Sequence, residues 1–231
     1  MKAIVKAALV TTLLFTGATA FGQSAETLQQ SAGNSGKGPH SYFDVVLNLV
    51  STNLYYGDAN TSVKDYRKSV LGAQAGVSFQ AGVSAHLSLV TEMYFMMKGG
   101  KLKAGNPETI AERTLRLYTA EIPVLARVHL GRFYVNAGPS MAYNFGGTST
   151  LNSSSKALSF TRSSEGFRRW EAGVQAGGGF EFPLKQKRVA LDLRYNYGLT
   201  NISYGKEMYN RSFIVSIHFS RAWKKNPLAI R

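Results

Sequence analysis

Cysteine is absent from this chain of 231 residues, and only 6 prolines and 13 acidic residues occur in it. Without cysteine, the chain has neither disulfides nor thiolate ligands for a metal, so one ordinary domain must fold without such cross-links. The apolar run from Ala7 to Phe15 is too short to cross a bilayer as a helix, and no longer run follows it. These absences exclude a disulfide-rich scaffold and a helical membrane protein.

Basic residues outnumber acidic ones, 27 to 13, and give a formal net charge of +14. Such an excess suits nucleic acid, an anionic membrane surface or a solvated exterior. The basic residues are scattered and concentrate in the expected loops. Together with the export signal described next, this favours the last two explanations, and we expect no nucleic-acid partner.

The N-terminus has the pattern of an export signal. Lys2 and Lys6 precede the apolar run, and the small residues from Ala18 to Ala20 suit a signal peptidase. We therefore predict a signal peptide over residues 1–20, with a second possible cleavage after Gly22. Residues 21–40 are rich in Gln, Ser and Gly, with almost no bulky apolar groups, and we expect a flexible leader there.

The segment "VALDLRYNYGLT", residues 189–200, alternates strictly between apolar and other residues, which predicts a β-strand. Stretches of this kind recur near residues 41–50, 69–80, 84–98, 112–130, 133–146, 167–182, 189–200 and 209–220. Their connections are alternately short and long, as in outer-membrane barrels with short periplasmic turns and long external loops. We predict an all-β fold: an up-and-down antiparallel transmembrane β-barrel of about eight strands over residues 41–220, followed by a periplasmic tail, 221–231.

The two faces of the strands differ in chemistry. Aromatic residues occur near both ends of the apolar face, as at two membrane interfaces, so we expect Leu191 to face lipid and Asp192 to face the lumen. The short-turn set is Phe79, Phe133, Phe180, Phe182, Phe219 and Trp223, and the long-loop set is Phe95, Tyr143, Phe145, Trp170, Tyr195, Tyr197 and Phe213. The rival is a secreted soluble barrel that binds an apolar ligand, which would need an apolar interior and a polar exterior.

Charged residues on the polar faces predict an ion-pair network that plugs a polar lumen, because buried charges must be paired. The expected members are Asp44, Glu92, Glu121, Glu171, Glu181, Asp192, Arg127, Arg194, His86, His129 and His218. We also expect β-bulges at Pro123 and Pro139, where a strand lacks one hydrogen-bond donor.

Catalytic signals are weak. His218 and Ser220 have the spacing of the His-x-Ser pair of barrel-type lipid A deacylases, but no Asn-Ala follows and no acid lies downstream to orient the imidazole. The glycines of "AGVQAGGGF" continue into a strand instead of a helix, so they do not predict a phosphate-binding loop. We expect no catalytic, cofactor-binding or metal-binding residue, and a lipid A-modifying enzyme is the lesser alternative.

The expected partners belong to the envelope: outer-membrane lipid, lipopolysaccharide, the barrel assembly machinery and envelope proteins of unknown identity. Basic residues at the expected outer end either meet lipopolysaccharide head groups or are simply solvated. They are Lys64, Arg67, Lys68, Lys98, Lys101, Lys103, Lys156, Arg162, Arg168 and Arg169.

Three stretches, "EIPVLARVHLGRFYVNAGPSMAYNF", "MKGGK" and "LDLRYNYGLTNIS", resemble the PorT-like outer-membrane β-barrel proteins of Bacteroidetes. With the strand layout, the resemblance covers residues 41–220. It implies an outer-membrane barrel whose relatives mostly lack an assigned biochemical role, some being linked to protein secretion. The tail "RAWKKNPLAIR" departs from the usual terminal aromatic and leaves Phe219 to play that part. The expected function is a structural or interaction role in the cell envelope.

Overall fold

The structure is a computed structural model, and it describes residues 41–84, 86–184 and 187–222. The predicted signal peptide, the leader and residues 223–231 of the predicted tail lie outside the described residues. Arg221 and Ala222, the first two residues of that tail, belong to the last strand of the barrel. Among the described residues, no helix is long and apolar enough to cross a membrane.

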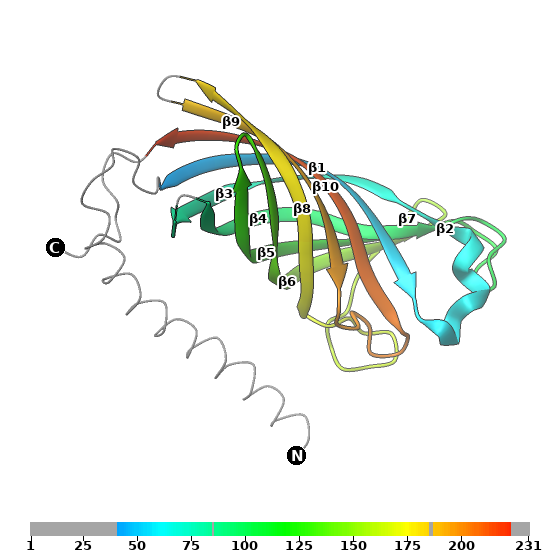
Figure 1. Cartoon of the computed structure of the whole chain (residues 1–231). Helices are drawn as coiled ribbons and strands as arrows, with labels where there is room; N and C mark the ends of the chain where they lie inside the picture. Colours follow the sequence, from blue (N-terminus) through cyan, green and yellow to red (C-terminus); the bar gives the residue numbers. More distant parts are fainter. Residues whose placement is uncertain (1–40, 85, 185–186, 223–231) are drawn as a thin grey trace, which may run out of the picture.

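Eight long strands pair antiparallel in chain order, and the last pairs with the first, which closes a barrel (Figure 1). This confirms the predicted up-and-down barrel. The strands are β1 (Tyr42–Tyr56), β3 (Val70–Gly82), β4 (Leu87–Leu102), β5 (Arg113–Leu130), β6 (Phe133–Leu151), β8 (Trp170–Leu184), β9 (Lys187–Gly198) and β10 (Met208–Ala222). Three short elements are the 3-10 helix η1 (Asp58–Tyr66), β2 (Arg67–Lys68) on β4, and β7 (Ser154–Ala157) on β6.

The connections sort by length as predicted. Short ones join β3 to β4, β5 to β6 and β8 to β9, and they lie at the end of the barrel where β1 begins and β10 ends, the short-turn end. Residues 57–69, 103–112, 152–169 and 199–207 make the opposite, long-loop end. Between β5 and β6, Gly131 has φ 69°, the positive value that a two-residue hairpin turn needs at its first position.

Several strands run further into the long-loop end than the sequence pattern predicts. β1 continues past residue 50 to Tyr56, β4 continues past residue 98 to Leu102, and β6 continues past residue 146 to Leu151. In β1 the alternation of buried and more exposed side chains persists through Thr52, Leu54 and Tyr56. The barrel wall is therefore taller at this end than expected.

The bulges expected at two prolines are not formed. Pro123 pairs with Ser140 and Pro139 pairs with Val174, without a register shift at either position. Two pairs are missing from the β5–β6 ladder after Pro123, but the register resumes unchanged at Ala126. Proline has no N–H to donate, and the β5–β6 ladder lacks two residue pairs here, but no extra residue is inserted into either strand.

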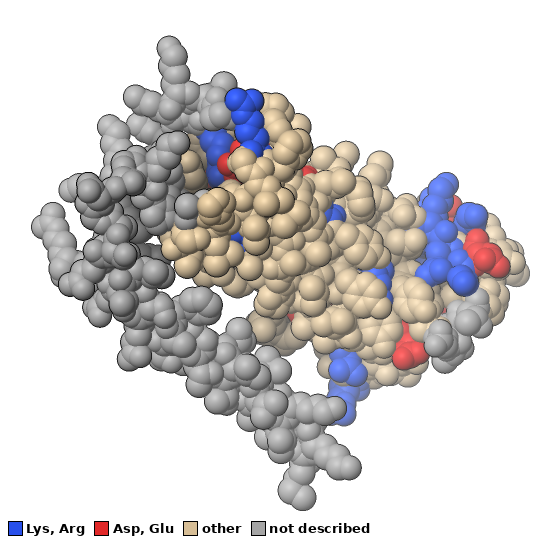
Figure 2. Space-filling model, in the orientation of Figure 1, with Lys and Arg blue, Asp and Glu red and all other residues tan. Residues whose placement is uncertain are grey.

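Apolar side chains cover the outside of the barrel. Leu191 and Leu193 are 44% and 49% exposed, whereas Asp192 and Arg194 on the other face are 2% and 1% exposed. Figure 2 shows a broad belt nearly free of charged residues between the two ends of the barrel. Aromatic residues border this belt, with Phe133 exposed near the short turns and Trp170 exposed near the long loops. This confirms the predicted faces and excludes the soluble barrel, which needs the reverse arrangement.

Candidate functional site

The middle of the lumen is filled by an ion-pair network. Arg194 of β9 bonds Glu92 of β4 at 2.7 Å between Nη1 and Oε2, and its Nε lies 3.4 Å from Asp192 Oδ2. Arg127 of β5 reaches the same Asp192 oxygen, with 3.6 Å from Nη2 to Oδ2. All four side chains are buried. The prediction that Arg127 and Arg194 pair with acidic residues in the lumen is confirmed.

Arg188 extends the network toward the short-turn end. Its guanidinium bonds Asp44 Oδ2 at 3.2 Å from Nη2 and Glu181 Oε1 at 2.7 Å from Nη1, and it stacks on the Tyr42 ring. The predicted strands end at residue 182 and resume at residue 189, which leaves Arg188 in the connection between them. The alternation of β9 reveals it instead, because Arg188 shares a face with Asp192 and Arg194.

Two of the predicted lumenal histidines do face the interior, and one does not. His218 is fully buried between Asp44 and Asp192, and His129 contacts Ser88 at 2.9 Å between Nε2 and Oγ. His86 is exposed beside the first short turn, so its assignment to the network was wrong. The strand begins only at Leu87, later than the expected start at residue 84, so its alternation does not reach His86.

Lys98 extends the network toward the long-loop end. Its Nζ lies 2.8 Å from Glu171 Oε2 and 3.3 Å from Glu121 Oε2, and only 2% of its side chain is exposed. Its inclusion among the outer basic residues was therefore wrong, because β4 continues beyond it and turns it inward with Glu92. Gln175 donates to Glu121 Oε1 at 2.8 Å and joins this part of the network to the polar plug.

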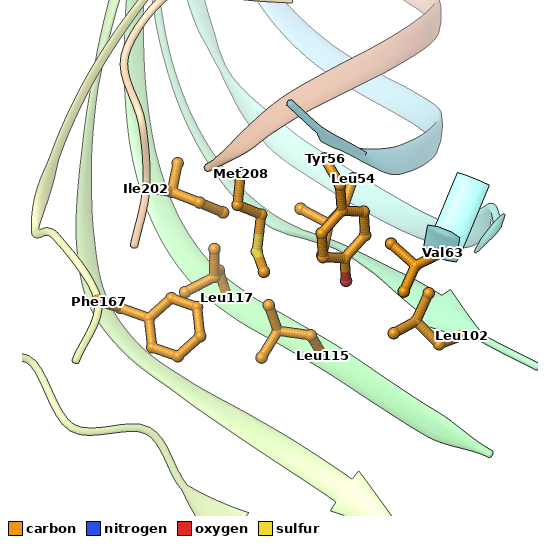
Figure 3. Close-up of a cluster of buried hydrophobic side chains, with 9 residues drawn as sticks. All are labelled: Leu54, Tyr56, Val63, Leu102, Leu115, Leu117, Phe167, Ile202 and Met208. Atoms are coloured by element: carbon orange, nitrogen blue, oxygen red, sulfur yellow. The ribbon is translucent and has the colours of Figure 1, made fainter. Parts of the chain in front are cut away.

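Above the polar plug, the interior changes to an apolar cluster. The side chains point toward one another from β1, η1, β4, β5, β10 and two long loops (Figure 3). The cluster comprises Leu54, Tyr56, Val63, Leu102, Leu115, Leu117, Phe167, Ile202 and Met208. The expectation of a wholly polar lumen was thus wrong at this end, where the longer strands and the loops together exclude water from the interior.

A cavity of about 550 Å³ lies over the apolar cluster at the long-loop end. Tyr56, Leu115 and Phe167 of the cluster form part of its wall, and the remaining wall is rich in hydroxyl and charged groups. These polar residues include Glu108, Arg113, Ser149, Ser154, Lys156, Ser159, Ser164, Glu165, Ser203 and Lys206. The space is therefore suited to an amphipathic group, with an apolar part against the cluster and a polar part at the rim.

Ion pairs stabilise part of this rim. Glu108 Oε1 lies 2.7 Å from Lys206 Nζ, and Glu108 Oε2 lies 3.7 Å from Arg113 Nη1. Lys101 and Glu112 form a further pair that does not line the cavity. Figure 2 shows that Lys and Arg gather at this end of the molecule. The rim is therefore charged, and two of its cations, Arg113 and Lys206, are paired with Glu108.

His218 and Ser220 do not form a catalytic pair in this geometry. Ser220 Oγ accepts a hydrogen bond from Arg188 Nε at 3.2 Å, and no hydrogen bond joins it to His218 within the described part of the chain. Both side chains are buried on the lumenal face, away from the lipid that a lipid A-modifying enzyme would use. Within the same described ranges, no group of three or more His, Asp or Glu side chains could hold a metal ion.

Comparison with known proteins agrees with this architecture. A family described as "Outer membrane protein beta-barrel domain" matches residues 23–204 of the chain. A search of curated proteins gave no match.

Several solved structures of outer-membrane proteins are similar to this chain at low sequence identity. OprG, an outer membrane protein from Pseudomonas aeruginosa, has 12% identity and a TM-score of 0.46, over 82% of this chain and 98% of its own. Neisserial surface protein A has 13% identity and a TM-score of 0.45, over 78% and 97%. Ail, the attachment invasion locus protein of Yersinia pestis, has 6% identity and a TM-score of 0.42, over 78% and 99%. With the family match covering most of the sequence, the chain belongs to the outer membrane protein beta-barrel domain family and is a small outer-membrane β-barrel protein.

Proposed function

We propose that this protein is a non-conducting barrel, which is anchored in the outer membrane by its strands and binds an envelope partner at its long-loop end. The observation that carries the proposal is the division of the interior. The middle and the short-turn end hold a network of paired charges, whereas a cavity of about 550 Å³ lies at the long-loop end of the described residues.

The ion pairs oppose conduction. An ion crossing the barrel would have to displace Arg194 from Glu92 and Lys98 from Glu171, which are bonded at 2.7 and 2.8 Å. Breaking such buried pairs is costly because each partner would remain as an unpaired charge in a poorly hydrated interior. The apolar cluster adds a second barrier above them.

The cavity suits part of a protein partner. Its apolar wall can receive a hydrophobic side chain, while serine hydroxyls and the charged rim can bond to a polypeptide backbone. The PorT-like resemblance adds a finer proposal, that this partner takes part in protein secretion. We propose no catalytic role, and a strain lacking the protein should retain its lipid A composition.

Conductance and cross-linking test the proposal together. The purified protein in planar lipid bilayers should give no stepwise conductance, and stable steps would contradict the sealed lumen. In intact cells, a photo-crosslinker at Lys156 or Glu165 on the cavity rim should capture a discrete partner. The same probe at Arg132, exposed in a short turn, serves as the control.

A cavity-filling variant makes the cross-linking specific. Ala157 lies on β7, is exposed and lines the cavity, so Ala157→Trp should occupy space without disturbing the barrel. We expect the adduct from Lys156 to be lost in this background. An adduct that persists unchanged, or that forms equally from Arg132, would show that the cavity does not bind the partner.

A further inference from the structure

The outward face of β10 carries an arginine surrounded by tyrosine rings. Arg211 Cζ lies 3.4 Å from the ring centre of Tyr197, 5.4 Å from that of Tyr55 and 5.9 Å from that of Tyr209. Its Nη1 donates to the carbonyl oxygens of Gly198 and Asn210 at 2.5 and 3.3 Å. These contacts fix the guanidinium in place and leave Nε and Nη2 to bond a ligand.

A second arginine lies over one of the same rings. Arg67 Cζ is also 5.4 Å from the centre of Tyr55, and its Nε donates to the carbonyl oxygen of Lys64 at 3.1 Å. Because both Cζ atoms lie 5.4 Å from the centre of the Tyr55 ring, the two guanidinium groups are separated by no more than twice this distance. Glu207 accepts a hydrogen bond from Tyr209, and neither arginine forms an ion pair with a carboxylate of the described residues.

A surface hollow of about 340 Å³ lies between the two arginines. Ser51, Asn53, Tyr195 and Phe213 contribute to its lining, and the lining contains no acidic residue. Two positive charges held together without a protein anion attract an external one. The hollow thus has the charge, the hydroxyl groups and the room for a phosphate group.

The position of the hollow identifies the source of that phosphate. Tyr195 and Phe213 belong to the aromatic border at the long-loop end, and the exposed side chains of Leu49 and Val215 continue down the apolar belt from it. A ligand here must have an anionic head at the membrane interface and acyl chains along the belt. With the long loops outward, that ligand is a phosphorylated glycolipid of the outer leaflet.

We propose that Arg67 and Arg211 bind a phosphate of the lipid A part of lipopolysaccharide, with an acyl chain packed against Leu49 and Val215. Arginine favours phosphate because its planar guanidinium can donate two parallel hydrogen bonds to the oxygens. The tyrosine rings keep the guanidinium groups at the interface. This site gives a definite location to the expected contact with lipopolysaccharide, and it is separate from the cavity proposed to bind a protein.

Lipid binding to the full chain in nanodiscs tests the site. The probe is hexa-acylated lipid A carrying two phosphates, titrated and counted by native mass spectrometry. We expect the double variant Arg67→Gln/Arg211→Gln to weaken binding about tenfold. Arg116→Gln is the matched control. Arg116 is exposed on β5 and lies two residues from the outward Tyr118, just as Arg211 lies two residues from the outward Phe213 on β10. Its replacement should leave binding unchanged.

Two further ligands separate the possible outcomes. Lipid A without phosphates should bind the wild type as weakly as the double variant binds the phosphorylated form, and inorganic phosphate should not compete at equal concentration. Equal binding by the double variant and the wild type would overturn the proposal, as would equal binding of dephosphorylated lipid A. Competition by inorganic phosphate would assign the site to a free anion. Heat-modifiable migration on gels verifies that each variant is folded.

Discussion

Arg194 on β9 donates a hydrogen bond to Glu92 on β4, with 2.7 Å between Nη1 and Oε2. The two strands are not neighbours in the sheet, since β4 lies between β3 and β5 and β9 lies between β8 and β10. The bond therefore crosses the lumen and ties opposite walls of the barrel together. Both side chains are 0% exposed, so neither charge can be satisfied by water if its partner is removed.

Removing Arg194 should destabilise the barrel strongly. Arg194→Gln leaves Glu92 as a buried carboxylate without a cation, and such losses cost about 3 to 5 kcal/mol. The measurement is reversible urea unfolding in lipid vesicles, followed by tryptophan fluorescence. An unfolding midpoint equal to that of the wild type would mean that the pair contributes nothing.

The double variant Arg194→Gln/Glu92→Gln tests the pairing itself. Because it removes both charges, it should be more stable than Arg194→Gln alone, and the two single effects should not add. Strict additivity would show that the two residues act independently despite the short bond.

Lys98 and Lys101 provide a comparison three residues apart. Lys98 is buried between Glu121 and Glu171, so Lys98→Gln should cost about 3 to 5 kcal/mol of unfolding free energy. Lys101 pairs with Glu112 at the surface, where its side chain is 28% exposed, and Lys101→Gln should cost only about 0 to 1 kcal/mol. The same vesicle assay measures both, and similar penalties would mean that Lys98 is hydrated.

The apolar cluster should behave as a core. Leu117 is fully buried in it, and Leu117→Ala should lower the unfolding free energy by about 2 to 5 kcal/mol. Ile110, which is 93% exposed in a long loop, is the control, and Ile110→Ala should change stability by about 0.5 kcal/mol or less. If Leu117→Ala were as mild as the control, the loops would not be packed onto the strands.

Strict alternation explains why much of this architecture is readable from the sequence. In β9 it fixes the outward face of Leu191 and Leu193 and the inward face of Asp192 and Arg194 with no further information. The same rule also assigns Lys98 and Arg188 to the lumen. Lys98 was misplaced because the predicted strand ended too early, and Arg188 because the predicted strand began too late. A period-two pattern does not define the ends of a strand sharply.

The long-loop end was less predictable because its structure depends on distant segments. Val63 and Ile202 come from stretches without strand periodicity, and Phe167 was predicted to begin a strand that in fact starts at Trp170. All three side chains are buried because three loops meet over the end of the barrel. The 3-10 helix at Asp58–Tyr66 contributes Val63 to this cluster. The hollow between Arg67 and Arg211 likewise requires the closure of β1 against β10, which joins the two ends of the barrel sequence.

The central claim is that the apolar face of the strands meets lipid, and two exposed leucines, one in β9 and one just after it, test it most directly. Leu193 lies in the middle of the outward belt and is 49% exposed, whereas Leu199 lies just beyond the end of β9 and is 55% exposed. In lipid-vesicle unfolding, Leu193→Arg should cost about 2 to 4 kcal/mol, because it places a charge near the bilayer midplane, and Leu199→Arg about 0 to 1 kcal/mol at the interface. Equal penalties at the two positions, or a wild-type protein that folds fully without lipid or detergent, would contradict the account.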